Sequence, residues 1–278
     1  MRHYSRTEWD RVFDSVLGER LGPSVGQEYD EVSAVQLYTL GARKQVDDRV
    51  YHYARAGAAL VAPCTYRLAV NADLQSATTW GMALAAPGIA VGDRICNVTH
   101  ANYGLPVATS VALNELVGGW IEIWGAANAF AWRRIVANSA SVLGVPATIT
   151  ITVDRPFNFL VAAGAGVVAL HRNIYYNVQQ MGALPTYQSA NGVPPVPVAN
   201  GSFFWLQTWG PCYIASQLGN PGAVADFRDV YAGAGGALLS LTDAYAAAAH
   251  VSPQRVGYIM GMSTNGDGNN DVMLQLAP

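Results

Sequence analysis

The chain has 278 residues, of which 51% are hydrophobic and 13% carry a charge, about half the charged fraction of an average soluble domain. Its net charge of −3 argues against nucleic acid as a partner, because nucleic-acid binding needs a basic surface. No apolar run is long enough to span a membrane, and no apolar segment follows the first arginines as it does in a signal peptide.

The charged residues are concentrated near the N-terminus. Eight of the 16 Lys and Arg residues and nine of the 19 Asp and Glu residues lie at or before Arg55, and Lys44 is the only lysine. A soluble monomer usually relies on surface charge, so the charge-poor remainder predicts an obligate homo-oligomer whose outer surface contacts other protein. The alternative is a surface of Ser, Thr, Asn, Gln and Gly, as in many extracellular β-proteins.

The first predicted element is an amphipathic helix over Ser5–Leu17. Ser5 or Thr7 can cap its N-terminus, and Gly18 ends it. Apolar residues recur at helical spacing, at Trp9, Val12, Phe13, Val16 and Leu17. We assign residues 1–35 to this helix and an arm, and residues 36–278 to a β-rich body. The helix either docks on its own subunit or reaches a neighbouring one.

From Val35 onward the apolar pattern is that of strands. Val35–Leu40 and Arg49–Ala54 bracket a charged turn and are expected to pair as a long hairpin. Further strand-like runs follow at Tyr66–Val70, Gly88–Val91, Gly119–Trp124, Trp132–Val136, Thr148–Val153, Phe159–Leu170, Phe203–Thr208, Gly257–Met262 and Val272–Leu276. Many short strands separated by Gly, Pro and Asn predict an all-β fold with a sandwich-like or barrel-like body of antiparallel strands. The segment 226–250 is ambiguous, because its alanines favour a helix and its glycines interrupt one.

The chain is organised around the aromatic segment Ala199–Ala215. It contains the pattern W-x-x-x-W-G, with apolar residues on both faces, which predicts a strand covered on two sides and interrupted at Gly210-Pro211. The same pattern occurs at Trp120–Gly125, so we predict two related β-units with a boundary near residue 155 or 195. We interpret six aromatic residues as core or interface anchors: Trp9, Phe13, Trp120, Trp124, Trp205 and Trp209.

No motif predicts catalysis. Ser24 lies in a G-x-S-x-G string, but not between a strand and a helix as a nucleophile requires. Gly164–Ala169 resembles a dinucleotide fingerprint, but strand-like residues follow it in place of a helix. Cys64, Cys96 and Cys212 are odd in number and lack C-x-x-C spacing, so they are expected to be buried free thiols of a protein made in a reducing cytosol. We therefore expect no catalytic residue, no cofactor, no metal and no enzyme activity.

Two acidic features leave alternatives open. Glu115 and Glu122, the only glutamates in the last four fifths of the chain, could form a glycosidase pair. The favoured interpretation is that Glu122 lies on a strand and pairs with Arg133 or Arg134. The segment 265–271 alternates oxygen-bearing side chains but lacks the glycine and glutamate of an EF-hand, so a hairpin tip is favoured over a calcium site.

The C-terminal sequence VGYIMGMSTNGDGNNDVMLQLAP resembles the ending of tailed-bacteriophage virion proteins: a V-G-Y strand, a polar hairpin and a final apolar strand. Shorter pieces resemble the layout of such head proteins, at Leu40-Gly41, Asp48–Gly57, Val117–Trp120, Arg134-Ile135, Asn138–Ala140 and Phe204–Pro211. The resemblance implies a capsid decoration (cement) protein. It implies a homotrimer that is made in the host cytoplasm, becomes part of the virion and binds the shell of major capsid protein.

Two other functions are weighed against this one. The first is a glycan-binding virion fibre or lectin-like β-module that uses exposed Trp and Tyr rings as sugar platforms. The second is a hydrolase whose site has no recognisable motif. Substitution of the tryptophans distinguishes the first alternative from an assembly role. Loss of a core or interface anchor should prevent folding or assembly, whereas loss of a sugar platform should leave folding intact and remove only ligand binding.

Overall fold

The computed structural model describes residues 26–60, 69–71, 83–100, 111–124, 130–140, 147–165, 167–180, 189–214, 228–233, 236, 238–239, 254–262 and 270–278. Within these ranges the chain forms strands and no helix, and every pair of named strands is antiparallel. The predicted all-β, antiparallel class is therefore confirmed. The predicted helix Ser5–Leu17, with Trp9 and Phe13, lies outside the described residues.

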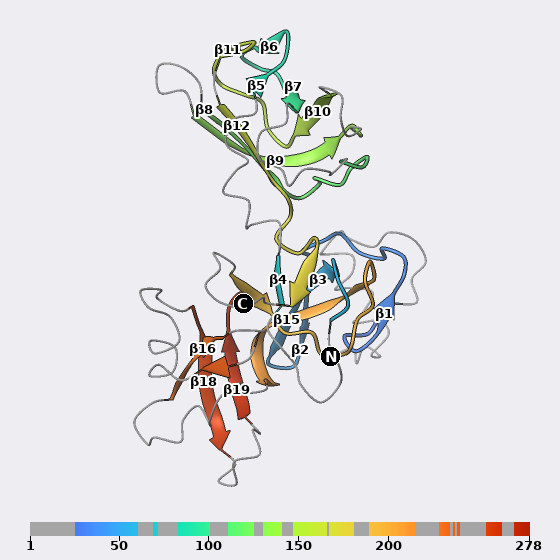
Figure 1. Ribbon diagram of the computed structural model, residues 1–278, viewed down its shortest axis with the longest axis vertical. Coiled ribbons are helices and arrows are strands. Elements are labelled where there is room, and N and C mark those ends of the chain that lie inside the picture. The colour runs from blue at the N-terminus through green and yellow to red at the C-terminus, as the bar shows by residue number, and fades with distance from the viewer. Residues whose placement is uncertain are drawn as a thin grey trace, which may run out of the picture.

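The strands form two bodies (Figure 1). The upper body in the figure consists of β5 (Ala83–Leu84), β6 (Gly88–Ile89), β7 (Ile95–His100), β8 (Trp120–Trp124), β9 (Phe130–Asn138), β10 (Ala147–Val153), β11 (Val161–Ala162) and β12 (Val167–His171). The lower body consists of β1 (Val32–Ser33), β2 (Arg43–Val46), β3 (Arg49–Arg55), β4 (Ala69–Asn71), β13 (Val178–Gln180), β14 (Ala190–Gly192), β15 (Phe203–Tyr213), β16 (Asp229–Ala232), β17 (Leu238–Leu239), β18 (Arg255–Met262) and β19 (Asn270–Gln275).

The upper body is an insertion within the lower one. The chain leaves the lower body after β4 and returns to it at β13, and these two strands pair directly in one small sheet of order β13-β4-β14. We call the described residues within 83–171 the inserted body and the other described residues the main body. The boundaries predicted near residues 155 and 195 fall inside these bodies, between β10 and β11 and between β14 and β15.

The inserted body is a six-stranded sheet of order β12-β8-β9-β10-β7-β5 that rolls up until its two edge strands lie next to each other. A backbone hydrogen bond from Gly164 N to Leu84 O, 2.9 Å long, helps to close the roll. Apolar side chains alternate along the strands, so that Ile149 and Ile151 of β10 are fully buried inside while Thr148 is exposed. This arrangement is consistent with the predicted sandwich-like or barrel-like body.

The main body is built on β15, which pairs with β3 on one side and β19 on the other in the sheet β17-β16-β18-β19-β15-β3-β2. Residues 204–208 are buried on both faces. Phe204 and Leu206 pack into one apolar cluster, and Trp205 packs into another with Tyr51 and Tyr53. The prediction that this strand is covered on two sides is confirmed.

The prediction that Gly210-Pro211 interrupts the strand is wrong. β15 continues to Tyr213, and Pro211 lies opposite Met273 of β19. The register against β3 shifts between Gln207 and Trp209 and the pairing ends at Trp209, so Pro211 pairs only with β19, where a missing donor on its other side is tolerated. Gly210 has φ +95°, and a Cβ there would lie 2.5 Å from the backbone oxygen of Asp48, so only glycine fits this close approach.

Two other predicted elements are corrected. The first hairpin is formed by β2 and β3 with a tight turn at Asp47-Asp48, and not by Val35–Leu40, which is irregular. The run Phe159–Leu170 is divided into β11 and β12 by a turn at Gly164. The ambiguous segment 226–250 contains β16 and β17. The other predicted runs coincide with described strands, with ends that differ by a few residues, except that residues 66–68 of the run Tyr66–Val70 lie outside the described residues.

Candidate functional site

The outer face of the inserted body gathers aromatic side chains from three neighbouring strands. β8 lies between β9 and β12, and its sequence Trp-Ile-Glu-Ile-Trp alternates strictly. Ile121 and Ile123 are fully buried in the core, so Trp120, Glu122 and Trp124 point to the outside. The register of the three strands defines three cross-strand rows on this face: Arg134–Trp120–His171, Trp132–Glu122–Ala169 and Phe130–Trp124–Val167.

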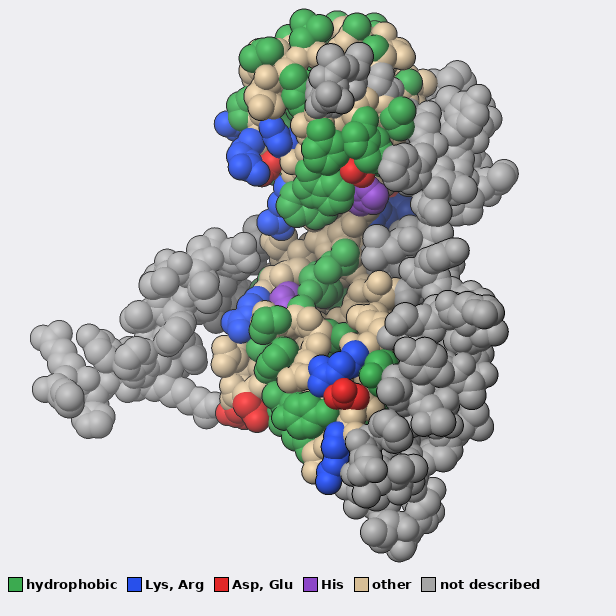
Figure 2. All heavy atoms as spheres, turned by 90° about the vertical axis from the view of Figure 1, so that its left-hand side faces the viewer, with side chains coloured by type: hydrophobic (Ala, Val, Ile, Leu, Met, Phe, Trp, Pro, Cys, Tyr) green, Lys and Arg blue, Asp and Glu red, His purple; other side chains and the backbone are tan. Residues whose placement is uncertain are grey.

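The rings pair across the strands. The ring centroids of Trp120 and Trp132 are 5.6 Å apart, with planes inclined at 35°, and those of Trp124 and Phe130 are 6.1 Å apart at 39°. Trp132 remains 40% exposed and Phe130 50% exposed, and Val136 and Val167 are also exposed. We name this surface the aromatic face and define it by Trp120, Trp124, Phe130, Trp132, Val136 and Val167. Figure 2 shows hydrophobic side chains gathered on the upper body beside an acidic side chain and a histidine.

A polar pair lies among these rings. His171 Nε2 is 3.3 Å from Glu122 Oε2, and the two side chains are 31% and 13% exposed. The ring of Trp132 stacks against His171 at 5.4 Å and 27°, so it lies close to this hydrogen bond. The pair therefore places a carboxylate and an imidazole between exposed aromatic rings, where both can meet a bound partner.

The predicted pairing of Glu122 with Arg133 or Arg134 is wrong. The register places Trp132 opposite Glu122, whereas Arg134 lies opposite Trp120. Arg133 lies opposite Ile121, and its Nη1 donates to the backbone oxygen of Trp132. Arg134 lies on the same face in the adjacent row, but within the described residues neither arginine forms an ion pair with Glu122, whose hydrogen-bond partner is His171 of β12.

Glu115 is held in a different environment. Its Oε1 accepts hydrogen bonds from Nε and Nη2 of Arg172, at 3.0 and 2.6 Å, and its Oε2 accepts one from the backbone nitrogen of Ala112 at 2.7 Å. Both side chains of the ion pair are nearly buried, with 12% of Arg172 and 10% of Glu115 exposed. The carboxylate of Glu115 is thus committed to a structural ion pair with Arg172, whereas that of Glu122, which is almost as covered at 13% exposed, lies beside His171 on the outer face of the sheet.

The tryptophans of the second W-x-x-x-W pattern lie in the main body. Trp205 is 2% exposed, its Nε1 donates to the backbone oxygen of Gln27 at 3.1 Å, and its ring packs against Tyr38 and Tyr53. Trp209 is half-buried, further along β15. The same sequence pattern therefore places Trp120 and Trp124 on an outer face and Trp205 in a core.

Sequence reasoning missed Phe130, Trp132 and His171 as members of the site. Phe130 and Trp132 lie at alternate positions of one strand, as do Trp120 and Trp124 of the next, and this alternation was the signal available in the sequence. His171 had no such signal, because it reaches Glu122 only through the register of β12 against β8.

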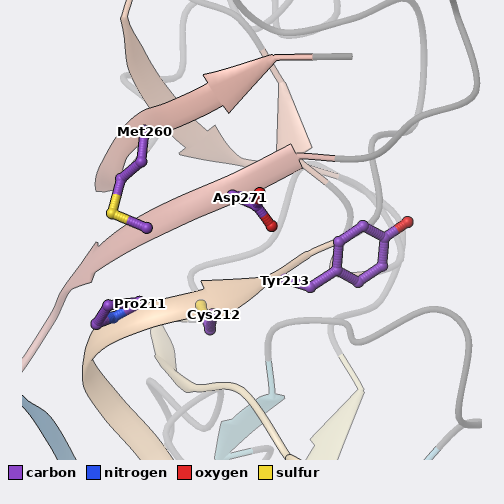
Figure 3. Close-up of a pocket in the computed structure, with 5 residues that line it drawn as sticks. All are labelled: Pro211, Cys212, Tyr213, Met260 and Asp271. Atoms are coloured by element: carbon purple, nitrogen blue, oxygen red, sulfur yellow. The ribbon is translucent and has the colours of Figure 1, made fainter.

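A hollow with a volume of about 470 Å³ lies on the main body. It is lined by Pro211, Cys212 and Tyr213 of β15, Met260 of β18 and Asp271 of β19 (Figure 3). Burial, together with the negative charge of Asp271, raises the pKa of Cys212 to about 12. The thiol is therefore protonated at neutral pH and is a poor nucleophile. Burial raises the pKa of Cys96 to about 12 as well, and both described cysteines are free thiols.

The described residues contain no group of three or more His, Cys, Asp and Glu side chains that could hold a metal ion. The described part of the chain likewise contains no helix suited to crossing a membrane. Most of the candidate calcium segment, residues 265–269, lies outside the described ranges. Comparison with known proteins finds no matching family, no matching curated protein and no matching solved structure.

Proposed function

We propose that the chain is a structural subunit of a virus particle, of the capsid decoration type, and that it acts by binding other proteins through the aromatic face. One observation carries this proposal: three tryptophans and a phenylalanine, partly exposed, lie together on one outer sheet face of the inserted body. Exposed apolar surface of this kind marks binding surfaces on soluble proteins.

The chemistry of the face suits a protein partner. Aromatic residues and arginine are enriched in protein–protein interfaces, and tryptophan is among the residues whose removal costs the most binding energy. The rings stand on a hydrogen-bonded sheet and pack against one another in pairs, so little side-chain freedom remains to be lost on binding. The low charge of the chain supports the same role, because a subunit covered by its neighbours needs little charge for solubility.

The virion is proposed from the resemblance of the C-terminal sequence to tailed-phage head proteins. On this proposal the partner is the shell of major capsid protein, and the subunit itself is a homotrimer. The described residues that carry the resemblance at the C-terminus include β18 and β19, and β19 pairs with β15 at the centre of the main body. The main body would then form the scaffold, and the inserted body would present the binding surface.

Co-sedimentation with purified phage shells that lack their decoration protein tests the proposal. We expect the full chain to bind, and Trp132→Ala with Phe130→Ala to weaken binding at least about tenfold, as removal of interface hot spots does. Leu160→Ala is the matched control, since Leu160 is exposed on the same body but is not part of the aromatic face. Equal binding of the double variant and wild type would overturn the role of the face, and no binding by wild type would overturn the role in a shell.

Glycan binding is a second candidate, favoured by the Glu122–His171 pair. Hydrogen-bonding groups set among aromatic rings are what a sugar site also requires. On this alternative, the Trp132→Ala variant would keep its oligomeric state and shell binding and would lose only the binding of oligosaccharides. Isothermal titration with cellohexaose and maltohexaose distinguishes the two functions.

A further inference from the structure

We infer that the aromatic face binds a protein segment that presents a cationic side chain, an arginine or a lysine, to the carboxylate of Glu122. This inference rests on the proposed function, because it names the chemistry of the partner at the same face. It follows from the central position of Glu122, from the hydrogen bonds or positive charge that a carboxylate requires when it is covered, and from the attraction of the surrounding indole rings for cations.

Glu122 is the central residue of the three cross-strand rows and the only carboxylate among their nine members. Its partner on this face is His171, which contacts Oε2. No hydrogen bond to Oε1 is found within the described part of the chain. Water can reach this carboxylate in the free protein because the side chain is partly exposed.

A partner that covers the face removes this water. A carboxylate taken out of water must be compensated by hydrogen-bond donors or by a positive charge, or the complex is penalised. One hydrogen bond to an imidazole leaves most of this requirement unmet. A cationic side chain of the partner, placed at Oε1, would satisfy it with a charge-assisted hydrogen bond.

The surrounding rings favour a cation as well. Trp120 and Trp124 each lie two residues from Glu122 on the same strand, about 7 Å along it, and the face of an indole ring attracts positive charge. The chain already uses this contact elsewhere: the guanidinium of Arg55 lies 5.0 Å from the ring of Tyr176, and Lys44 Nζ lies 5.5 Å from that of Trp205.

Arginine fits better than lysine, since its planar guanidinium both stacks on rings and donates two parallel hydrogen bonds to a carboxylate. A flat sugar ring fits less well, because the paired rings are inclined by 35° and 39° and do not share a plane. Arg134 is exposed in the neighbouring row, opposite Trp120. The partner must therefore present a negative or an uncharged group to the guanidinium of Arg134. The face therefore selects a partner by its charge pattern as well as by its apolar surface.

The inference is tested on the full chain labelled with ¹⁵N at its tryptophans. The indole N–H signals of Trp120, Trp124 and Trp132 are followed by NMR during titration with arginine amide and with citrulline amide, its uncharged analogue. We expect both to perturb these signals, and arginine amide to bind about tenfold more tightly, which corresponds to about 1.4 kcal/mol. Glu122→Gln, which keeps the shape and the hydrogen bond to His171, should abolish the preference.

Asp229→Asn is the matched control, because it removes the same charge from the main body and should leave the preference intact. Equal binding of arginine and citrulline amides overturns the inference, as does a response to cellohexaose or maltohexaose alone, which assigns the face to sugars. Shell binding separates the two proposals. Loss of the preference in Glu122→Gln without any shell binding by wild type refutes only the proposed function. Equal shell binding by Glu122→Gln and wild type refutes only the role of Glu122.

Discussion

Arg172 contacts a single carboxylate oxygen of Glu115 through two nitrogens, and this ion pair lies where the chain leaves the inserted body. Glu115 belongs to the turn that precedes β8, and Arg172 directly follows β12. The ion pair therefore holds the segment that leaves the inserted body against the turn before β8. The next residues continue into the main body, where Asn173 Nδ2 donates to the backbone oxygen of Leu40 and Arg55 N donates to Tyr175 O.

Removal of the charge at Glu115 should destabilise the protein strongly. Glu115→Gln removes the negative charge that lies against the nearly buried guanidinium of Arg172, and breaking one side of a buried pair costs about 3–5 kcal/mol. Asp229→Asn breaks the half-exposed pair with Arg255 and should cost less than about 1 kcal/mol. Urea unfolding of both variants measures the difference. A similar decrease in the free energy of unfolding in both variants would show that the Glu115–Arg172 pair stabilises the protein no more than a surface ion pair does.

The tryptophans should differ in their effect on stability according to their burial. Trp205→Ala empties a site in the core of the main body and should cost about 3–5 kcal/mol. Trp132→Ala removes a ring that is 40% exposed and should cost about 1 kcal/mol while the fold is kept. Thermal unfolding with circular dichroism measures both. A Trp132→Ala chain that fails to fold would identify this ring as part of the core rather than of a binding surface.

Gly210 and Gly92 form a matched pair for a test of the close contact beneath β15. Both have a positive φ, of +95° and +97°, but a Cβ on Gly210 would lie 2.5 Å from Asp48 O, whereas one on Gly92 meets nothing within 4 Å. Gly92→Ala should therefore cost only the backbone strain of about 1–2 kcal/mol. Gly210→Ala adds a clash with the backbone and should cost clearly more. If the two variants have the same free energy of unfolding, the strand has room to relax away from Asp48.

His52 should make the main body sensitive to acid. Burial, with a smaller effect from Arg43, lowers the pKa of His52 from 6.5 to about 4, while its ring stacks on Tyr175 at 4.8 Å and its Nδ1 lies 3.0 Å from Thr208 Oγ1. Between these two pKa values the unfolded chain binds more protons than the folded one, so stability rises with pH. The contribution is complete above pH 6.5 and is lost as the pH falls towards 4.

The measurement for His52 is the melting temperature of wild type and His52→Asn at pH 7, 5.5 and 4.5. Carboxylates that titrate below pH 5 affect both proteins alike, so the difference between the two curves reports on His52. Wild type should lose more stability than the variant as the pH falls through this window. Parallel curves would contradict the assignment.

The sequence predicted the strands whose residues alternate or are continuously apolar, such as those that contain Ile121 and Leu206, because burial dictates these patterns locally. It did not predict the strand at Arg43–Val46, whose polar side chains form an edge that needs no apolar face. Glu122 was predicted to lie on a strand, but its partner depended on the register between strands, which the sequence does not encode locally. For the same reason Trp132 and His171 could not be placed together in advance.

The direct pairing of β4 with β13 has a consequence for the order of folding. Among the described residues, the strands of the inserted body pair only with one another and are complete by residue 171, whereas β3 must wait for β15 to pair with it. A chain synthesised from its N-terminus can therefore fold the inserted body first. Once folded, that body replaces a long stretch of otherwise flexible chain between β4 and β13, which lowers the entropy cost of closing this loop when the two strands pair. The binding surface would then be assembled before the scaffold that carries it.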